Sequence, residues 1–432
     1  MNSLAKDLGA ITGGCKFLST PRASPGPTAL VGSGDSRAHH AGTADLADRK
    51  PRILWANPYC LLDLSSGASM TVREQLRQLH KLGWDVRVIG ATIFDSPKGI
   101  TRLAGHWEKI KQSKSKVVRV NDTPLVHNLV KTRSTQRAEM TAAEEAIWYQ
   151  TYTRALDQFK PDIVYYYGGR TLDLLIGDEA HARGIPVAAY LANGNFRGKR
   201  WCRDVDVVIT NSKATANLYR RQDGIDSVTL GPFVQTADVI APDRDPRNII
   251  AINPSLAKGA AIVAAVASRL EERRPDIQFE VVESRGNWTN IVNSVRKKLG
   301  QPNGQLANVT VTPNVSDMRQ VYGRARLLLV LSLWWESLPR VAIEATANHI
   351  PVLATNRSGL PEALGKSGVL FDLPDPCFKP PYNKLPPAEK INRIAATIER
   401  LQDDPIAYDG MQKKAAAKAQ SYNLETISRN LD

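Results

Sequence analysis

Two glutamates stand eight residues apart in the segment WWESLPRVAIEATANHIPVLATNRSGLPE, which runs from Trp334 to Glu362. Glu336 follows an apolar run typical of a buried strand, and Glu344 lies in a stretch whose apolar residues recur with helical spacing. A second apolar run then leads to a glycine turn at Gly359. Carboxylates accept strong hydrogen bonds from sugar and ribose hydroxyls, and backbone N–H groups of a glycine turn can approach phosphate oxygens. The segment therefore favours a ligand that carries both hydroxyls and phosphates.

These residues need elements that hold them in place, and the chain supplies a repeating pattern. Short apolar runs alternate with amphipathic stretches, which indicates βαβ units and a mostly parallel sheet. We expect strands at 53–56, 86–89, 163–166, 187–190 and 207–210, and in a second series at 249–252, 279–282, 309–311, 327–331 and 351–354. A helix should follow the first strand, with Val72, Leu76 and Leu79 on its buried face. In a doubly wound sheet the carboxyl ends of the strands form the ligand crevice, so both carboxylates and the glycine turn should meet at one mouth.

Composition divides the chain into four parts. Residues 1–50 are rich in Gly, Ala, Ser, Pro and Thr without a sustained period, and we expect them to be disordered. Two α/β domains follow at 51–235 and 248–375, joined through the segment 231–247, which holds three prolines and reads as a linker. Residues 376–432 begin with a second proline-rich linker and end in helices.

The overall composition indicates a soluble globular protein. Apolar residues make up 42% and charged residues 23% of the 432 residues, which is ordinary for this class. No run approaches the ~20 apolar residues that a membrane span needs, and no apolar stretch suited to a signal peptide follows Lys6. The four cysteines lie far apart without a CxxC pair, so neither a zinc site nor a disulfide framework is indicated. We expect a cytoplasmic location, no metal ion and no cofactor.

The net charge of +14 is unevenly spread along the chain. Residues 98–137 contain ten Lys and Arg side chains but only two carboxylates, which gives this stretch a net charge of +8. A second cluster consists of Arg197, Lys199, Arg200 and Arg203. Such clusters can hold phosphates, anionic lipid headgroups or nucleic acid, and a solvated surface loop is the alternative. Nucleic acid is the least favoured partner, because only Trp107 interrupts the basic stretch with an aromatic ring.

The ordered combination of strand, glutamate, helix, second glutamate and glycine turn resembles the E-x7-E signature of the retaining glycosyltransferase family 4, whose members have the GT-B fold. The turn 358–362 is similar to the family's GGxPE turn. The stretch from Ser316 to Ala325 is similar to a preceding helix with the pattern D-(L/M)-x-x-x-Y-x-x-A. The resemblance extends over about residues 50–375 and is strongest in 308–372. It implies two Rossmann-like domains facing each other across a cleft, with C-terminal helices that pack back on the first domain.

The resemblance implies a nucleoside-diphosphate sugar as donor and assigns roles residue by residue. Glu344 would hold the ribose hydroxyls, and Glu336 would face the transferred sugar near the reaction centre. Backbone N–H groups of the turn would contact the sugar or the pyrophosphate. The turn residues concerned are Ser358, Gly359 and Leu360.

Three other places complete the implied donor site. Ser66 and Gly67 resemble the family's small-residue loop, which opens a helix whose N-terminus approaches the donor phosphates. Lys258 matches one member of the cation pair that neutralises the departing diphosphate in this family, in place of a metal ion. The arginine usual five residues earlier is Asn253 here, which puts part of that stabilisation in doubt. Arg340, next to the signature, is our candidate to compensate.

The acceptor side departs further from the family. Members often carry a histidine at the carboxyl end of a first-domain strand, whereas the comparable stretches 167–170 and 190–195 contain none. Arg170 and Asn193 are our candidates for contacts with the acceptor or the sugar, and a purely structural turn is the alternative for both. No general base is predicted, because in retaining members the leaving phosphate oxygen is thought to take the acceptor proton.

We therefore predict a hexosyltransferase-type enzyme, with Glu336 and Lys258 as catalytic residues, that transfers a sugar to an acceptor hydroxyl with retention and without a metal ion. The acceptor would be a soluble or lipid-linked glycan, and residues 98–137 would then hold the enzyme on the anionic inner face of a membrane. A nicotinamide dehydrogenase and a P-loop enzyme are excluded by their absent glycine motifs. The alternative that stays open, because of Asn253 and the missing histidine, is a non-catalytic nucleotide-sugar-binding protein on a GT-B scaffold.

Overall fold

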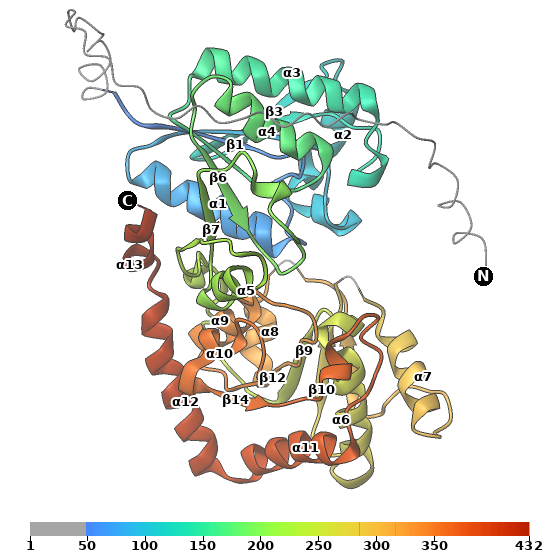
Figure 1. Ribbon diagram of the computed structural model, residues 1–432. Coiled ribbons are helices and arrows are strands. Elements are labelled where there is room, and N and C mark those ends of the chain that lie inside the picture. Colours follow the sequence, from blue (N-terminus) through green and yellow to red (C-terminus); the bar gives the residue numbers. More distant parts are fainter. Residues whose placement is uncertain (1–48, 285, 316, 432) are drawn as a thin grey trace, which may run out of the picture. The chain divides into compact units, whose positions relative to one another are not determined.

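The part of the chain that the structure describes begins at Arg49. The computed structural model describes residues 49–284, 286–315 and 317–431. The disorder expected for residues 1–50 falls almost wholly on a segment outside the described residues, and Ser316 also lies outside them. The described part forms two α/β lobes, each built around one β-sheet (Figure 1).

The first lobe is built on an eight-stranded sheet with the order β3-β4-β2-β1-β5-β6-β7-β8. All neighbouring strands are parallel except β3 and β4, which pair antiparallel. The strands are β1 (Arg52–Ala56), β2 (Asp85–Ala91), β3 (Val117–Asp122), β4 (Leu125–Val130), β5 (Ile163–Tyr166), β6 (Val187–Leu191), β7 (Val207–Thr210) and β8 (Val228–Thr229). The five strands expected in this half are confirmed as β1, β2, β5, β6 and β7.

Helices cover both faces of this sheet because its strands are apolar on both sides. On β1, Ile53 and Trp55 pack with Val72 and Leu76 of α1, while Leu54 packs on the opposite face with α3 (Figure 1). The predicted buried face of the first helix is therefore confirmed. The helices of this lobe are α1 (Gly67–Lys81), α2 (Ala104–Gln112), α3 (Ala142–Phe159), α4 (Thr171–His181) and α5 (Lys213–Asp223).

The basic stretch 98–137 is not the solvated loop that its charge allowed. It contains α2 and the two strands β3 and β4, and β4 pairs with β2 so that the sheet is extended. Ile110, Val120 and Leu129 are buried in one cluster under these elements. The apolar residues that fold this stretch are spaced among charged ones, which is why no strand was apparent from an apolar run.

The second lobe is built on a six-stranded parallel sheet with the order β11-β10-β9-β12-β13-β14. Its strands are β9 (Asn248–Ile252), β10 (Phe279–Val282), β11 (Val309–Thr312), β12 (Ala325–Val330), β13 (Val352–Thr355) and β14 (Gly368–Phe371). Its helices are α6 (Ala260–Arg273), α7 (Trp288–Lys298), α8 (Arg319–Arg324), α9 (Arg340–Ala347) and α10 (Leu360–Leu364). Five of these strands were expected, and β14 was not. The limits proposed for the two domains stay a prediction.

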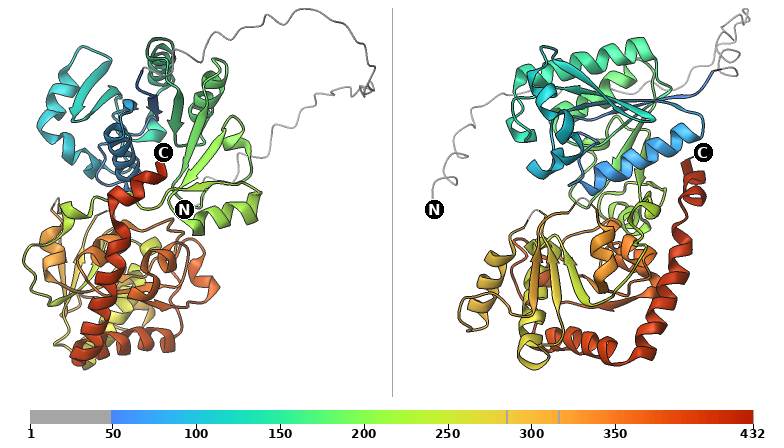
Figure 2. Two further views of the ribbon diagram at one scale, coloured as in Figure 1. Left: turned by 90° about the vertical axis from the view of Figure 1, so that its left-hand side faces the viewer. Right: turned by 180° about the vertical axis from the view of Figure 1, so that it is seen from behind.

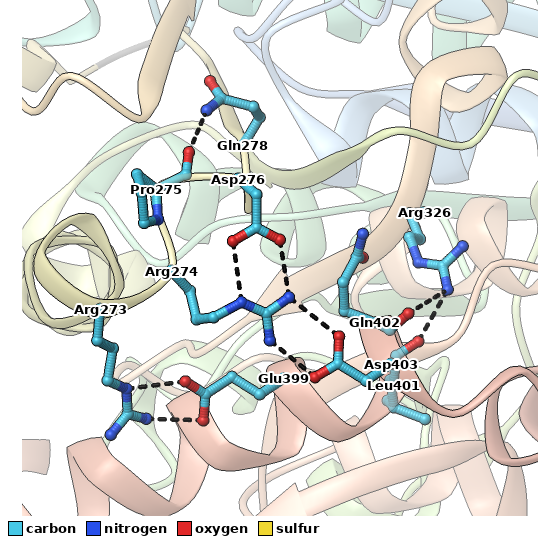
Figure 3. Close-up of polar contacts among 10 residues, drawn as sticks. All are labelled: Arg273, Arg274, Pro275, Asp276, Gln278, Arg326, Glu399, Leu401, Gln402 and Asp403. Atoms are coloured by element: carbon cyan, nitrogen blue, oxygen red, sulfur yellow. Dashed lines mark hydrogen bonds and ion pairs between the residues drawn. The ribbon is translucent and has the colours of Figure 1, made fainter.

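Three helices close the chain, α11 (Ala388–Asp403), α12 (Pro405–Ala419) and α13 (Leu424–Ser428). The apolar face of α11 joins the core of the second lobe, and α12 packs against α9. Where α11 meets the end of α6, ion pairs join Arg273 to Glu399 and Arg274 to Asp403 (Figure 3). The last of them, α13, reaches the first lobe, where Ile427 packs in the same small cluster as Leu230 and Phe233 and α13 lies beside α1 (Figure 2).

Candidate functional site

A cavity of about 710 Å³ lies between the two lobes, at the carboxyl ends of their central strands. Its wall includes polar residues that follow four of them within two positions. These are Asn57 after β1, Tyr167 after β5, Asn253 after β9 and, two residues beyond β6, Asn193. The strand order reverses between β1 and β5 in the first sheet and between β9 and β12 in the second. Both sheets therefore offer the cavity their topological switch point, the usual ligand site of such sheets.

Glu344 is held on the cavity wall by two partners. The Tyr322 hydroxyl donates to Oε2 at 2.7 Å, and Arg340 Nη2 lies 3.3 Å from Oε1. Burial, and then the charge of Glu344, raise the pKa of Tyr322 well above its usual value, so this hydroxyl stays a donor. Each carboxylate oxygen keeps lone-pair capacity beyond the bond it already accepts. Glu344 can therefore accept further hydrogen bonds from ligand hydroxyls without releasing its protein partners.

Glu336 forms the second polar centre of the cavity. Lys258 Nζ donates to its Oε1, and the Ser332 hydroxyl donates to the same oxygen at 2.9 Å. Gly259 explains how Lys258 reaches this position: its φ is +77°, and a Cβ there would lie 1.9 Å from the Leu331 carbonyl oxygen. Only glycine lets the backbone after Lys258 pass so close to β12.

The glycine turn lies behind Glu336 instead of on the cavity wall. The amide of Gly359 donates to the Glu336 carbonyl at 2.9 Å, and a Cβ on Gly359 would lie 1.7 Å from the Ser337 carbonyl oxygen. The Ser358 hydroxyl accepts from the Glu336 amide at 3.2 Å, and the Leu360 side chain is buried. The turn thus fixes the loop that carries Glu336. Its predicted direct contacts with the donor, through Ser358, Gly359 and Leu360, have no support from this placement.

The N-terminus of α1 faces the cavity from the first lobe, as predicted for Ser66 and Gly67, which both line it. The Ser66 hydroxyl caps the helix by accepting from the Ser69 amide at 3.4 Å, and the first turn holds no acidic residue. Arg340 of the second lobe comes close to this helix start: its Cδ lies 3.7 Å from the position that a Cβ on Gly67 would take. A helix N-terminus and a guanidinium therefore converge, which suits a phosphate group.

Asn253 lines the cavity where the family pattern has an arginine. Its φ is +61°, a left-handed conformation that asparagine adopts more readily than most residues with a Cβ. Its amide donates to the Val282 carbonyl at 2.8 Å and its carbonyl accepts from the Ser255 amide at 2.8 Å. The backbone at this position is thus fixed between β9 and β10, and Lys258 and Arg340 are among the cations that line the same cavity.

Of the two acceptor candidates, the structure brings only Asn193 to this cavity. Its side-chain amide donates to the Tyr167 hydroxyl at 3.0 Å, and its backbone pairs with that of Glu336 in an isolated bridge. Burial raises the pKa of Tyr167 to about 12, so its hydroxyl stays protonated. Arg170 does not line the first cavity; it lines a second one in the first lobe.

Charge on the first cavity's wall is mixed. Five cationic side chains and seven carboxylates line it, so the wall as a whole is not an anion trap. Lys258, Arg340 and the N-terminus of α1 all line this cavity. Lys98 and Arg102, from the basic stretch, also line the cavity, and Lys98 Nζ donates to the Ser284 carbonyl at 2.9 Å.

Ser337 and Glu362 join the two lobes beside this site. The Ser337 hydroxyl lies 3.1 Å from that of Ser212 and accepts from Thr215 at 2.8 Å, and Glu362 accepts from the first two amides of α5 at 3.0 and 2.9 Å. Glu362 thereby caps a helix of the opposite lobe, where a carboxylate is stabilised by the helix dipole. Sequence reasoning missed these contacts and the partnership of Tyr322 with Glu344, although Tyr322 belonged to a recognised motif.

The fold and the site together define the class: the chain has the GT-B fold of two α/β lobes around an interlobe site. A sucrose-phosphate synthase from Thermosynechococcus elongatus superimposes with a TM-score of 0.62 at 15% identity, over 89% of this chain and 97% of that one. HepE from Anabaena, in complex with UDP and glucose, gives a TM-score of 0.60 at 13% identity over 89% and 98%. At these identities the likeness concerns the fold alone.

The second lobe also resembles a known protein family in sequence. Residues 249–377, which make up most of this lobe, match the family described as "Glycosyl transferases group 1". A D-inositol 3-phosphate glycosyltransferase from Arthrobacter sp. (strain FB24) is 30% identical over 171 residues, which is 39% of this chain and 37% of that protein. The chain thus aligns with less than half of the length of that curated relative.

Proposed function

We propose that this protein is a glycosyltransferase of the E-x7-E type, family 4, which uses a nucleoside-diphosphate sugar as donor. The observation that carries the proposal is the paired arrangement of Glu344 with Tyr322 and Arg340, and of Glu336 with Lys258, on one cavity wall opposite the N-terminus of α1. The group 1 match of the second lobe and the relatives named as D-inositol 3-phosphate glycosyltransferases support the same activity.

The donor would lie across this wall according to the chemistry of each group. Glu344 accepts hydrogen bonds from the two ribose hydroxyls, because a carboxylate is a strong acceptor for neighbouring hydroxyls. The diphosphate would be held by Arg340, Lys258 and the first amides of α1, which all line this cavity. The sugar then extends toward Glu336 and Asn193, which adjoin each other through their backbone bridge.

The transfer we propose proceeds with retention. The bond between the anomeric carbon and the β-phosphate oxygen breaks, and an acceptor hydroxyl forms the new glycosidic bond on the same face of the sugar. The acceptor proton passes to the departing phosphate oxygen, so no protein base is needed. Lys258 stabilises the negative charge that develops on this oxygen, and this stabilisation is strongest in the transition state.

The acceptor side of the proposal concerns the first lobe. A soluble or lipid-linked glycan hydroxyl would enter beside Asn193. Four exposed lysines of α2 and the turn that follows it would hold the enzyme on an anionic membrane if the acceptor is lipid-linked, each contributing about 1 kcal/mol near the surface. They are Lys109, Lys111, Lys114 and Lys116. None of the helices in the described part of the chain has the length and apolarity needed to traverse a bilayer.

A two-step measurement tests the proposal. Thermal unfolding is first recorded with a panel of nucleoside diphosphates and nucleotide sugars, since a ligand at 100 times its Kd stabilises the folded state by about 2.7 kcal/mol. Release of nucleoside diphosphate from the best donor is then followed with time. Stabilisation with turnover supports a transferase. Stabilisation without any turnover favours the non-catalytic binder, and no stabilisation by any member of the panel contradicts a donor site.

A further inference from the structure

A second cavity, of about 680 Å³, lies in the first lobe next to the first one, and Asn195 lines both. Three stretches far apart in the sequence form its wall: 137–145 before and within α3, 169–174 at the start of α4, and 195–201 after β6. Because β5 and β6 are neighbours and parallel, the turns that follow them meet at the same edge of the sheet as the donor cavity.

Positive charge predominates in this wall. Four arginines and one carboxylate line the cavity; the arginines are Arg137, Arg170, Arg197 and Arg200, and the carboxylate is Glu145. Arg137 is buried and already has its partners, Glu145 at 2.8 Å and Asp173 at 3.7 Å. One carboxylate oxygen of Asp173, below the wall, also accepts from the amides of Gly169 and Arg170 at 3.1 and 3.0 Å. Glu145 and Asp173 therefore already have partners, in Arg137 and in the backbone of the turn at 169–170.

The other three arginines face the cavity without such partners. Among the ion pairs of the described residues, none involves Arg170, Arg197 or Arg200. Nη1 of Arg197 donates to the Gly194 and Phe196 carbonyls at 2.7 and 2.6 Å, which fixes its guanidinium at the rim. Counting Asp173 as well, four cations meet two carboxylates, so the cavity holds an excess of two positive charges.

An aromatic pair forms the rest of the wall. Phe196 and Trp201 stack with ring centroids 4.9 Å apart, and Gly169 admits Phe196, since a Cβ there would lie 2.7 Å from its ring. The indole N–H of Trp201 is buried and has no hydrogen-bond partner within the described part of the chain. A single exposed arginine is commonly solvated by water and needs no ligand. Three arginines around one cavity, none of them ion-paired among the described residues, suit an anion with several acceptor oxygens.

We propose that this cavity binds a phosphate monoester carried by the acceptor, so that the acceptor is a phosphorylated sugar or polyol. The inference rests on the proposed function, because it takes the first lobe as the acceptor side. A phosphate monoester carries about −1.5 to −2 charges and three strong acceptor oxygens, which matches guanidinium forks better than a single carboxylate does. Because Asn195 lines both cavities, an anion bound here would lie beside the cavity that would hold the transferred sugar.

The test uses inorganic phosphate on the full chain, at constant ionic strength, with the donor cavity saturated by the nucleoside diphosphate that stabilises it best. The apparent Kd for phosphate is obtained from thermal unfolding, with acetate as the carboxylate probe. We expect the double variant Arg170→Gln/Arg200→Gln to raise this Kd at least about fivefold, because two charge-assisted contacts are lost. Both side chains are exposed, so the variant should unfold at the wild-type temperature in chloride alone.

The matched control is Lys199→Gln, which removes one charge from the same loop but does not line the cavity. Its phosphate Kd should equal that of the wild type. An equal Kd in the double variant, or equal stabilisation by acetate and phosphate, would overturn the inference while leaving the donor site intact. Phosphate binding through these arginines in a protein that binds no nucleotide would instead contradict the proposed function, and the anion would not belong to an acceptor.

Discussion

Replacing Glu344 by glutamine tests the donor site without removing bulk. The variant Glu344→Gln keeps an oxygen that can accept from Tyr322, whose hydroxyl is fully buried 2.7 Å away, but it loses the negative charge. A hydrogen bond to a charged group contributes about 1.5–3 kcal/mol, so we expect nucleotide-sugar affinity to fall about 10- to 150-fold. The free energy of unfolding should fall by only about 1 kcal/mol, since the buried hydroxyl keeps a partner.

Calorimetric titration of the best donor into the wild type and the variant gives the two dissociation constants, and chemical unfolding gives the stabilities. Tyr322→Phe is the matched control, because it removes the 2.7 Å hydrogen bond but keeps the carboxylate. We expect it to lower stability by about 1 kcal/mol and to change the donor Kd by less than about fivefold. A Glu344→Gln protein that is folded and binds the donor as tightly as the wild type would refute the assignment of Glu344 to the ribose.

Three further predictions concern the leaving group, the metal and the membrane. Lys258→Ala should lower kcat by more than it raises the donor's KM, because charge on the diphosphate develops in the transition state; an effect on KM alone would contradict this role. Activity should persist in excess EDTA, and its complete loss would overturn the metal-free chemistry that we propose. Co-sedimentation with anionic vesicles should fall with salt and fall again in a variant with four Lys→Gln changes, whereas equal recovery with neutral vesicles would favour a soluble acceptor. The four positions are Lys109, Lys111, Lys114 and Lys116.

The central strands could be predicted because burial on both faces demands continuous apolar runs, such as the one that became β12. The strands β3 and β4 could not, since β3 is the edge strand, β4 lies next to it, and their sequences mix apolar residues with Arg119, Asp122 and His127. His127 and Asp122 are partners there: the Asp122 pKa is held well below its usual value by hydrogen bonds from His127 and Arg73, although burial opposes this shift. A pattern of single residues does not reveal such pairing between segments.

In the candidate site too, residues within sequence motifs could be predicted, whereas placements that depend on tertiary packing could not. Glu336, Glu344 and Lys258 belong to contiguous motifs, and the structure brings all three to one cavity. The place of Gly359 depended on tertiary packing: the sequence indicated a turn able to touch phosphate, but the close approach of the Ser337 backbone puts it behind the loop. Arg170 likewise acquires its neighbours only through the parallel pairing of β5 with β6.

The position of Ser337 couples the opening of the two lobes to the position of Glu336. Its hydroxyl is bonded to Asn211, Ser212 and Thr215 of the first lobe, while the preceding residue is Glu336. In the transfer that we propose, lobes that open to release the nucleoside diphosphate must break these hydrogen bonds next to Glu336, which we propose faces the transferred sugar. We therefore expect each opening to displace Glu336 as well, so that the proposed catalytic site is assembled only in the closed protein and donor hydrolysis is suppressed in the open one.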